Sequence, residues 1–163
     1  MVTFRLADSF PESLRSEWKH LLEIEEDRQR RIQYEAYLDR GRGHCHLRRA
    51  DIAGLVENQL RQFGGGSSGQ PESITGKRYE LRAWVIMPNH VHVLFQVAGA
   101  SLSEIVGQWK RNTGRLANRR LGKSGAFWAE DYFDTYMRNA GHEQQAIRYI
   151  EHNPAKARLV LDP

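Results

Sequence analysis

Two histidines, His90 and His92, lie two positions apart in the segment HVHVLFQV, whose composition is typical of a β-strand. On a strand, residues i and i+2 point to the same face, so the two imidazoles project side by side while Val91 and Val93 point the other way. Neutral imidazole is available near pH 7 and binds divalent metals, so the pair supplies half of a metal site. Two ordinary half-exposed histidines give the same pattern, and a site therefore needs ligands from another element.

The last predicted helix offers such a ligand in the segment IRYIEHNP. Tyr149 and Asn153 are four residues apart and share one helix face, with Gln145 and His152 on neighbouring parts of it. A tyrosine one turn from an amide ligand would lie beside the metal, although a packed helix tyrosine is the commoner case. The chain has no C-x-x-C and no H-E-x-x-H, so neither a zinc finger nor a zincin is indicated.

The elements that must position these residues follow from the hydrophobic pattern. We expect a strand over 2–6, a helix capped by Asp51 and running through Phe63, and a hairpin over 78–97 with its turn at Pro88-Asn89. Further helices are expected over 14–24, 28–38, 101–122 and 142–152, the last ending before Pro154, and a strand with irregular ends over 126–138. In the hairpin, regular alternation would put Tyr79, Leu81, Ala83, Val85 and Met87 on one side. The order of elements predicts an α+β fold, an antiparallel β-sheet with helices packed on it, of the ferredoxin-like kind.

The composition fits one globular domain over residues 1–163, with a flexible polar loop near 64–73, GGGSSGQPES. Hydrophobic residues make up 40% and charged residues 27%, which excludes collagen-like, disulfide-framework and wholly disordered classes. No apolar run is long enough for a membrane span, and the start of the chain has no secretory pattern. With Cys45 as the single cysteine, a cytoplasmic protein is the simplest expectation.

The net charge of +4 is unevenly distributed along the chain. Residues 105–129 contain six basic and no acidic residues, a net of +6, so the other 138 residues sum to −2. The six basic residues are predicted to lie on one helix and to form a phosphate-binding face for DNA. The alternative is a face that is merely solvated. The six are Lys110, Arg111, Arg115, Arg119, Arg120 and Lys123. Trp109 and Phe127 could stack on unpaired bases, but core positions are the favoured interpretation.

Several motifs together resemble a known family. MPNHVHVLFQ resembles the HUH motif (histidine, bulky hydrophobe, histidine) of the single-tyrosine transposases, and FWAEDYFDTYMRN followed by AIRYIEHNPAKARLV resembles their C-terminal pattern. The N-terminal VTFRLADS and residues 38–41 resemble the subgroup associated with repetitive extragenic palindromes (REP). The resemblance covers most of the chain and is weakest over 11–36 and in the glycine-serine loop.

This resemblance implies a fold, an activity and a set of site residues. His90, His92 and Asn153 fall on the metal ligands, with Mg²⁺ or Mn²⁺ as the expected ion, and Tyr149 falls on the nucleophile, with His152 as one candidate for the base. Tyr132 and Tyr136 match the family's strand pattern instead. The implied activity is a metal-dependent single-stranded DNA endonuclease and strand transferase that cleaves and rejoins hairpin-associated DNA through a 5′-phosphotyrosine intermediate. The implied partner is single-stranded or hairpin DNA, with repeated palindromes as the substrate, bound by a nucleoid-associated monomer or homodimer.

Two other functions remain open at this point. One is a DNA hairpin-binding protein without cleavage activity, which would bind DNA equally well after loss of His90. The other is an unrelated metal hydrolase that uses His90 and His92 with a water nucleophile, and it would turn over without a tyrosine adduct.

Overall fold

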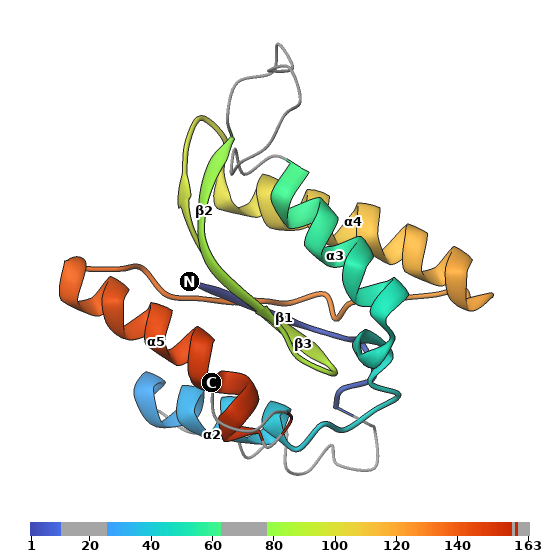
Figure 1. Cartoon of the computed structure of the whole chain (residues 1–163), viewed down its shortest axis with the longest axis horizontal. Helices are drawn as coiled ribbons and strands as arrows, with labels where there is room; N and C mark the ends of the chain where they lie inside the picture. Colours follow the sequence, from blue (N-terminus) through green and yellow to red (C-terminus); the bar gives the residue numbers. More distant parts are fainter. Residues whose placement is uncertain (11–25, 63–77, 158, 160–163) are drawn as a thin grey trace.

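The computed structural model describes residues 1–10, 26–62, 78–157 and 159, and within these ranges the chain forms a sheet covered by helices (Figure 1). The strands are Val2–Arg5 (β1), Tyr79–Ile86 (β2), His90–Val97 (β3) and Phe133–Asp134 (β4). The α-helices are Asp27–Asp39 (α2), Ala50–Gln62 (α3), Leu102–Leu121 (α4) and Ala140–Lys156 (α5), and a 3₁₀ turn (η2) spans His46–Arg48.

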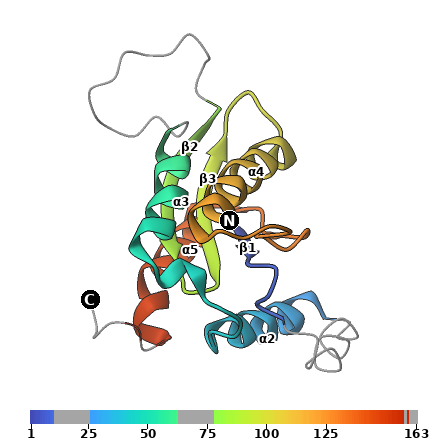
Figure 2. The same cartoon turned by 90° about the vertical axis from the view of Figure 1, so that its right-hand side faces the viewer.

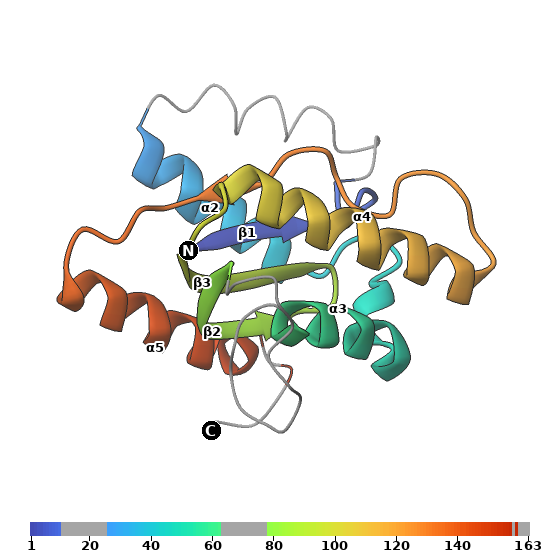
Figure 3. The ribbon, with the colours of Figure 1, turned by 90° about the horizontal axis from the view of Figure 1, so that it is seen from above.

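The four strands are paired antiparallel in the order β2-β3-β1-β4. Figure 3 shows β1, β3 and β2 side by side in this order. β1 and β3, which are far apart in the sequence, are neighbours at the centre, as in a split β-α-β unit. The predicted α+β fold of the ferredoxin-like kind is therefore confirmed.

The helices cover both faces of the sheet. α3 and α4 pack on the face that carries Val91 and Val93, where they enclose the larger hydrophobic core (Figure 2). α5 packs on the opposite face, against Leu94 and the side of β2 that carries Ala83 and Val85. α2 lies beside the C-terminal part of α5, where Lys156 and Asp39 form an ion pair at 2.9 Å. The two histidines of β3 point away from the larger core and toward α5.

Aromatic side chains fill the core under α4. The indole N–H of Trp109 donates to the Tyr79 hydroxyl (3.0 Å), which in turn donates to the Leu60 carbonyl (2.7 Å). Trp109 and Phe127 are both buried, with 2% and 8% of their surface exposed. Their favoured interpretation as core residues is confirmed, because rings buried in this way offer no face to a base.

β2 departs from the regular alternation that the sequence predicts. A bulge between Leu81 and Ala83 shifts the register against β3 by one residue. Tyr79 and Leu81 therefore face the α3–α4 core, whereas Ala83 and Val85 face α5. The prediction of one continuous face was wrong because a bulge leaves one residue unpaired and exchanges the two sides of the strand beyond it.

Two helix boundaries also differ from expectation. α5 does not end before Pro154 but includes it and continues to Lys156. Proline removes one N–H donor, yet the Ala157 N–H still donates to the Asn153 carbonyl (3.0 Å), so the last turn persists. Asp51 lies inside the first turn of α3 and pairs with Arg49 at 2.9 Å instead of capping the helix.

The ends of α4 are as predicted, whereas β4 is shorter. Ser101 accepts from the Glu104 N–H and completes a capping box, and Gly122 ends α4 in the left-handed conformation (φ 63°). Of the strand expected over 126–138, only Phe133–Asp134 pairs as β4, together with an isolated bridge from Trp128 to Leu6.

Two expected features, the helix over 14–24 and the loop over 64–73, lie outside the described residues. Within the described residues, no helix is both long and apolar enough to cross a membrane.

Candidate metal and tyrosine site

The histidine pair, His90 and His92, lies at the centre of the sheet with its rings converging. The two Nε2 atoms are 3.1 Å apart, and the ring planes are inclined by 81°. Both side chains are buried, with 1% and 0% of their surface exposed. The predicted shared face is confirmed, and the strand aims two nitrogen donors at one point.

Each ring is held through its other nitrogen. His90 Nδ1 lies 2.8 Å from Asn89 Oδ1, and the Asn89 amide is oriented by the bond from its Nδ2 to the Arg42 carbonyl (3.1 Å). Because Oδ1 is only an acceptor, His90 carries its hydrogen on Nδ1 and presents the lone pair of Nε2. His92 Nδ1 is 2.7 Å from Thr3 Oγ1 on β1. Such contacts behind the ring orient a histidine for metal binding.

Burial keeps His90 neutral. Desolvation, assisted by the positive charge of Lys156, lowers the pKa of His90 from 6.5 to about 3. A neutral imidazole is the form that binds metal, whereas a protonated one repels it. At pH 7 the ring is therefore ready to act as a ligand.

α5 places its polar residues directly against the histidine pair. The Tyr149 ring packs edge-on against His92, with ring centroids 5.3 Å apart at 78°. Asn153 is fully buried, and neither its Oδ1 nor its Nδ2 has a hydrogen-bond partner within the described part of the chain. The Tyr149 hydroxyl is likewise buried without a hydrogen bond there. Tyr149 is thus brought to the histidine pair, and Asn153 lies one turn further along the same helix face. The unpartnered polar atoms of the two residues point to a missing ligand.

This donor set fits an octahedral divalent ion. Neighbouring ligands at about 2.1 Å from such an ion are about 3.0 Å apart, close to the separation of the two Nε2 atoms. The unpartnered Asn153 Oδ1 supplies the oxygen that Mg²⁺ and Mn²⁺ prefer. The residues present therefore suit the group that the sequence resemblance implies.

The Tyr149 hydroxyl is surrounded by negative charge that the sequence did not reveal. Burial first, and then the carboxylates of Glu35 and Asp39 on α2, raise the pKa of Tyr149 above its ordinary value of 10.0. The Lys156 ammonium lies over the Tyr149 ring, 5.6 Å from its centroid. The raised pKa keeps the phenol protonated at neutral pH. The helix expected over 28–38 is present as α2, but its packing against α5 was not predicted. Its weak apolar periodicity gave no signal that it would meet α5.

The two other polar residues of α5 do not join the site. His152 is exposed, and its Nδ1 lies 2.8 Å from the Arg148 carbonyl of its own helix. Gln145 is also exposed. Neither residue is held toward the Tyr149 hydroxyl.

Five of the six predicted basic residues lie on α4, across the sheet from the histidine pair, and Lys123 follows the end of that helix. Lys110, Arg111 and Arg115 line a groove of about 520 Å³ between α4 and residues 125–132. Lys110 is tied to that segment by bonds to the Glu130 and Asp131 carbonyls (2.7 and 3.2 Å). The other three basic residues do not line this groove: Arg120 is 4.0 Å from Asp51, Lys123 is 3.0 Å from His46, and Arg119 is exposed.

The fold and the site define a class of protein: an α+β domain with two inward-facing histidines on a central strand, opposed by a tyrosine on a helix. The sequence profile described as "Transposase IS200 like" matches residues 70–153, which include the histidine pair, α4 and Tyr149. The chain belongs to the family of IS200-like transposases, and the resemblance to transposases found in the sequence is confirmed.

A solved structure of a REP-associated tyrosine transposase bound to a REP hairpin is similar in fold, with a TM-score of 0.52 and 16% sequence identity. The alignment covers 98% of this chain and 67% of that one. Comparison with curated proteins gives no match.

Proposed function

We propose that this transposase is a metal-dependent single-stranded DNA endonuclease and strand transferase with Tyr149 as its nucleophile. The observation that supports the proposal is the pair of buried Nε2 atoms 3.1 Å apart, with the Tyr149 ring packed against His92 and the unpartnered Asn153 amide one turn away on α5. A site of this composition holds a scissile phosphate beside a phenol, which is the requirement for covalent cleavage.

His90, His92 and Asn153 would hold a Mg²⁺ or Mn²⁺ ion in this arrangement. When bound, the ion neutralises charge that develops on the phosphate oxygens. Asn89 and Thr3 keep the two rings in place, so the ligands need no reorganisation.

Tyr149 performs the covalent step. Its Oη forms a bond to phosphorus while the bond from phosphorus to the 3′ oxygen breaks, giving a 5′-phosphotyrosine and a free 3′-hydroxyl. The reverse attack by a 3′-hydroxyl rejoins DNA without ATP, because the phosphotyrosine conserves the phosphodiester bond.

The phenol must lose its proton during attack. We propose Glu35 as the acceptor, because its carboxylate acts on the Tyr149 hydroxyl, whereas Asp39 is paired with Lys156. The substitution Glu35→Gln should slow cleavage while DNA binding is retained. Asp39→Asn removes the other nearby carboxylate together with its ion pair to Lys156, and it should not slow cleavage.

The Tyr149 hydroxyl is buried here, so entry of a phosphate requires α2 to move relative to α5. The ion pair between Lys156 and Asp39 holds these two helices together. Lys156→Met should therefore increase the rate at which DNA reaches the tyrosine, measured as the rate of adduct formation at limiting protein.

The substrate follows from the groove on α4. We propose that Lys110, Arg111 and Arg115 bind phosphates of a DNA hairpin, by analogy with the REP hairpin held by the structurally similar transposase. A DNA-handling protein of this kind is expected at the nucleoid in the cytoplasm, as a monomer or homodimer.

The decisive experiment incubates the protein with Mn²⁺ and hairpin oligonucleotides that carry single-stranded flanks, followed by denaturing gels. Wild type should form a covalent protein–DNA adduct, and Tyr149→Phe should not. Tyr136→Phe is the control, because Tyr136 is 84% exposed and is not part of the site. Equal adduct with Tyr149→Phe would overturn the assignment. No adduct from wild type, with hairpin binding unchanged in His90→Ala, would instead identify a hairpin-binding protein without cleavage activity.

A further inference from the structure

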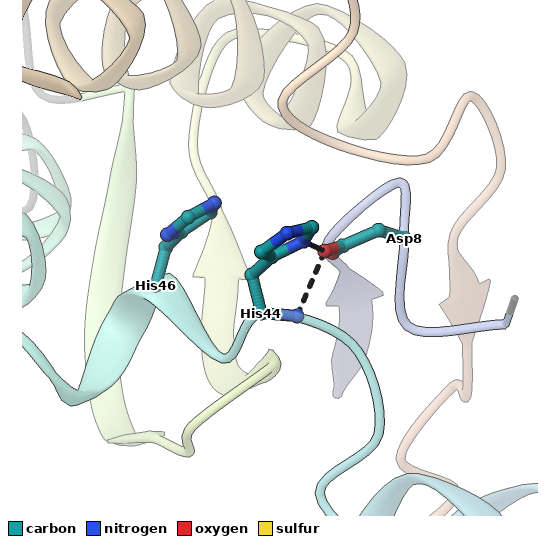
Figure 4. A group of neighbouring side chains, drawn as sticks. All are labelled: Asp8, His44 and His46. Atoms are coloured by element: carbon teal, nitrogen blue, oxygen red, sulfur yellow. Dashed lines mark hydrogen bonds and ion pairs between the residues drawn. The ribbon is translucent and has the colours of Figure 1, made fainter. Parts of the chain in front are cut away.

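A second group of metal-ligating side chains lies outside the histidine pair. Asp8 follows β1, whereas His44 precedes η2 and His46 begins it. One ligand atom from each of the three lies within 4.8 Å of the other two. Figure 4 shows the two imidazole rings side by side with the Asp8 carboxylate next to His44.

The backbone holds these two segments together closely. The His44 N–H donates to Asp8 Oδ2 at 2.8 Å, and His44 Nδ1 lies 2.5 Å from the same oxygen. Gly43 adopts φ +87°, and a Cβ at that position would come within 2.6 Å of the Asp8 carbonyl oxygen. Only glycine permits this approach. The carboxylate is therefore fixed beside the first histidine before any ligand arrives.

The rings are also ordered by stacking. His44 lies parallel to His46, with centroids 5.2 Å apart at 9°, and His46 stacks on Phe127 at 6.3 Å. Partial burial, and then the charge of Lys123, lower the pKa of His46, which favours its neutral form. Partial burial opposes ionisation of Asp8, but the bonds from His44 outweigh it and lower the pKa of that carboxyl. The protonation states match those of metal ligands.

We propose that Asp8, His44 and His46 bind a divalent transition-metal ion, with Zn²⁺ as the reference. Two imidazoles and one carboxylate form a recognised donor set for such ions, with a water completing the coordination. Donors that bind one tetrahedral ion at 2.0–2.2 Å are about 3.3–3.6 Å apart, so a group whose ligand atoms lie within 4.8 Å of one another must contract by about 1 Å. The His44 side chain is 67% exposed and has room to turn.

Lys123 provides a test that distinguishes a metal site from a simple ion-pair cluster. Its Nζ lies 3.0 Å from His46 Nε2 and donates to the lone pair that a metal would use. Lys123 is exposed and must turn away when an ion binds. Removing its charge should therefore strengthen metal binding.

The site would stabilise the turn that precedes the histidine pair. Asn89, which orients His90, donates to the Arg42 carbonyl, and the Leu47 N–H donates to the Pro88 carbonyl at 3.2 Å. An ion bound by Asp8, His44 and His46 would hold residues 42–47, which make both of these bonds, in place. This proposal is independent of the proposed cleavage reaction.

The test uses the full chain with the histidine pair replaced, His90→Asn and His92→Asn, so that one site remains. After equilibration with Zn²⁺ and dialysis, about one Zn²⁺ per chain should remain bound, and competition with a chromophoric chelator gives its affinity. Asp8→Asn, His44→Ala or His46→Ala in this background should weaken binding at least ten-fold, whereas His142→Ala, a control at a half-buried histidine outside the group, should not. No retained Zn²⁺, or equal affinity in His44→Ala and His142→Ala, would overturn the proposal.

A second measurement needs no change to the histidine pair. Wild type and Lys123→Met are titrated with Co²⁺, whose visible absorption reports nitrogen and oxygen ligation. The Lys123→Met chain should bind Co²⁺ several-fold more tightly at one class of sites, and His46→Ala should abolish the difference. Identical titrations of wild type and Lys123→Met would refute the assignment.

Discussion

Acidification should destabilise the metal-free protein through His90 over a defined range of pH. The folded-state pKa of His90 is about 3 against an ordinary value of 6.5, so the unfolded chain binds a proton that the folded chain excludes. The stabilisation is complete above about pH 6.5 and is lost as the pH falls from there toward 3.

The magnitude follows from the same two pKa values. Between pH 7.5 and 5.0 the unfolded chain takes up a proton at His90 that the folded chain does not bind. Integrated over this range, the difference equals one full proton over about 1.5 pH units. At about 1.36 kcal/mol per unit, the free energy of unfolding falls by about 2 kcal/mol. Because His90 is only 1% exposed, solvent screening does not reduce this figure appreciably.

The assay is urea unfolding followed by circular dichroism at several pH values in the presence of EDTA. His90→Asn is the informative variant, since its amide can still donate to Asn89 while it does not titrate. Its free energy of unfolding should fall by about 2 kcal/mol less than that of wild type between pH 7.5 and 5.0. His142→Asn, a control at a half-buried histidine of α5, should behave as wild type. Parallel pH profiles for wild type and His90→Asn would refute the reasoning.

Three further predictions concern the framework around the sites. Thr3→Val removes the contact behind the His92 ring and should weaken Mn²⁺ binding, measured by calorimetry, about ten-fold. An unchanged Mn²⁺ affinity would show that this contact does not orient the ring. Gly43→Ala should lower the free energy of unfolding by roughly 1–3 kcal/mol more than Gly99→Ala, because both have positive φ but only Gly43 would clash with a neighbouring backbone; equal losses in thermal melts would contradict this. Ser101→Ala should cost about 1 kcal/mol by breaking the capping box, and Ser103→Ala clearly less, as measured by urea unfolding.

Periodic patterns predicted the strongest elements and the face of β3. The alternation of HVHVLFQV correctly puts the histidines on one face, and Tyr149 of the last helix packs against that face. Such local periodicities survive folding because burial of one face selects the register.

What the sequence did not predict depends on contacts between distant segments. The bulge in β2 allows the two halves of the strand to face different hydrophobic cores, and no residue type in the segment YELRAWVI predicts it. Glu35 reaches Tyr149 only because α2 lies beside α5, which no sequence pattern encodes. His44 and His46 repeat the spacing of the histidine pair, but their relation to Asp8 emerges only when Gly43 brings the two segments together.

The position of the sheet between the basic groove and the tyrosine has a consequence for DNA length. A single DNA molecule that occupies both must pass around an edge of the sheet and span two packed layers, roughly 20 Å. At about 3.4 Å per stacked nucleotide this is on the order of six nucleotides. If the proposed groove and nucleophile act on one DNA molecule, the thickness of the sheet would set the distance between the recognised structure and the cut.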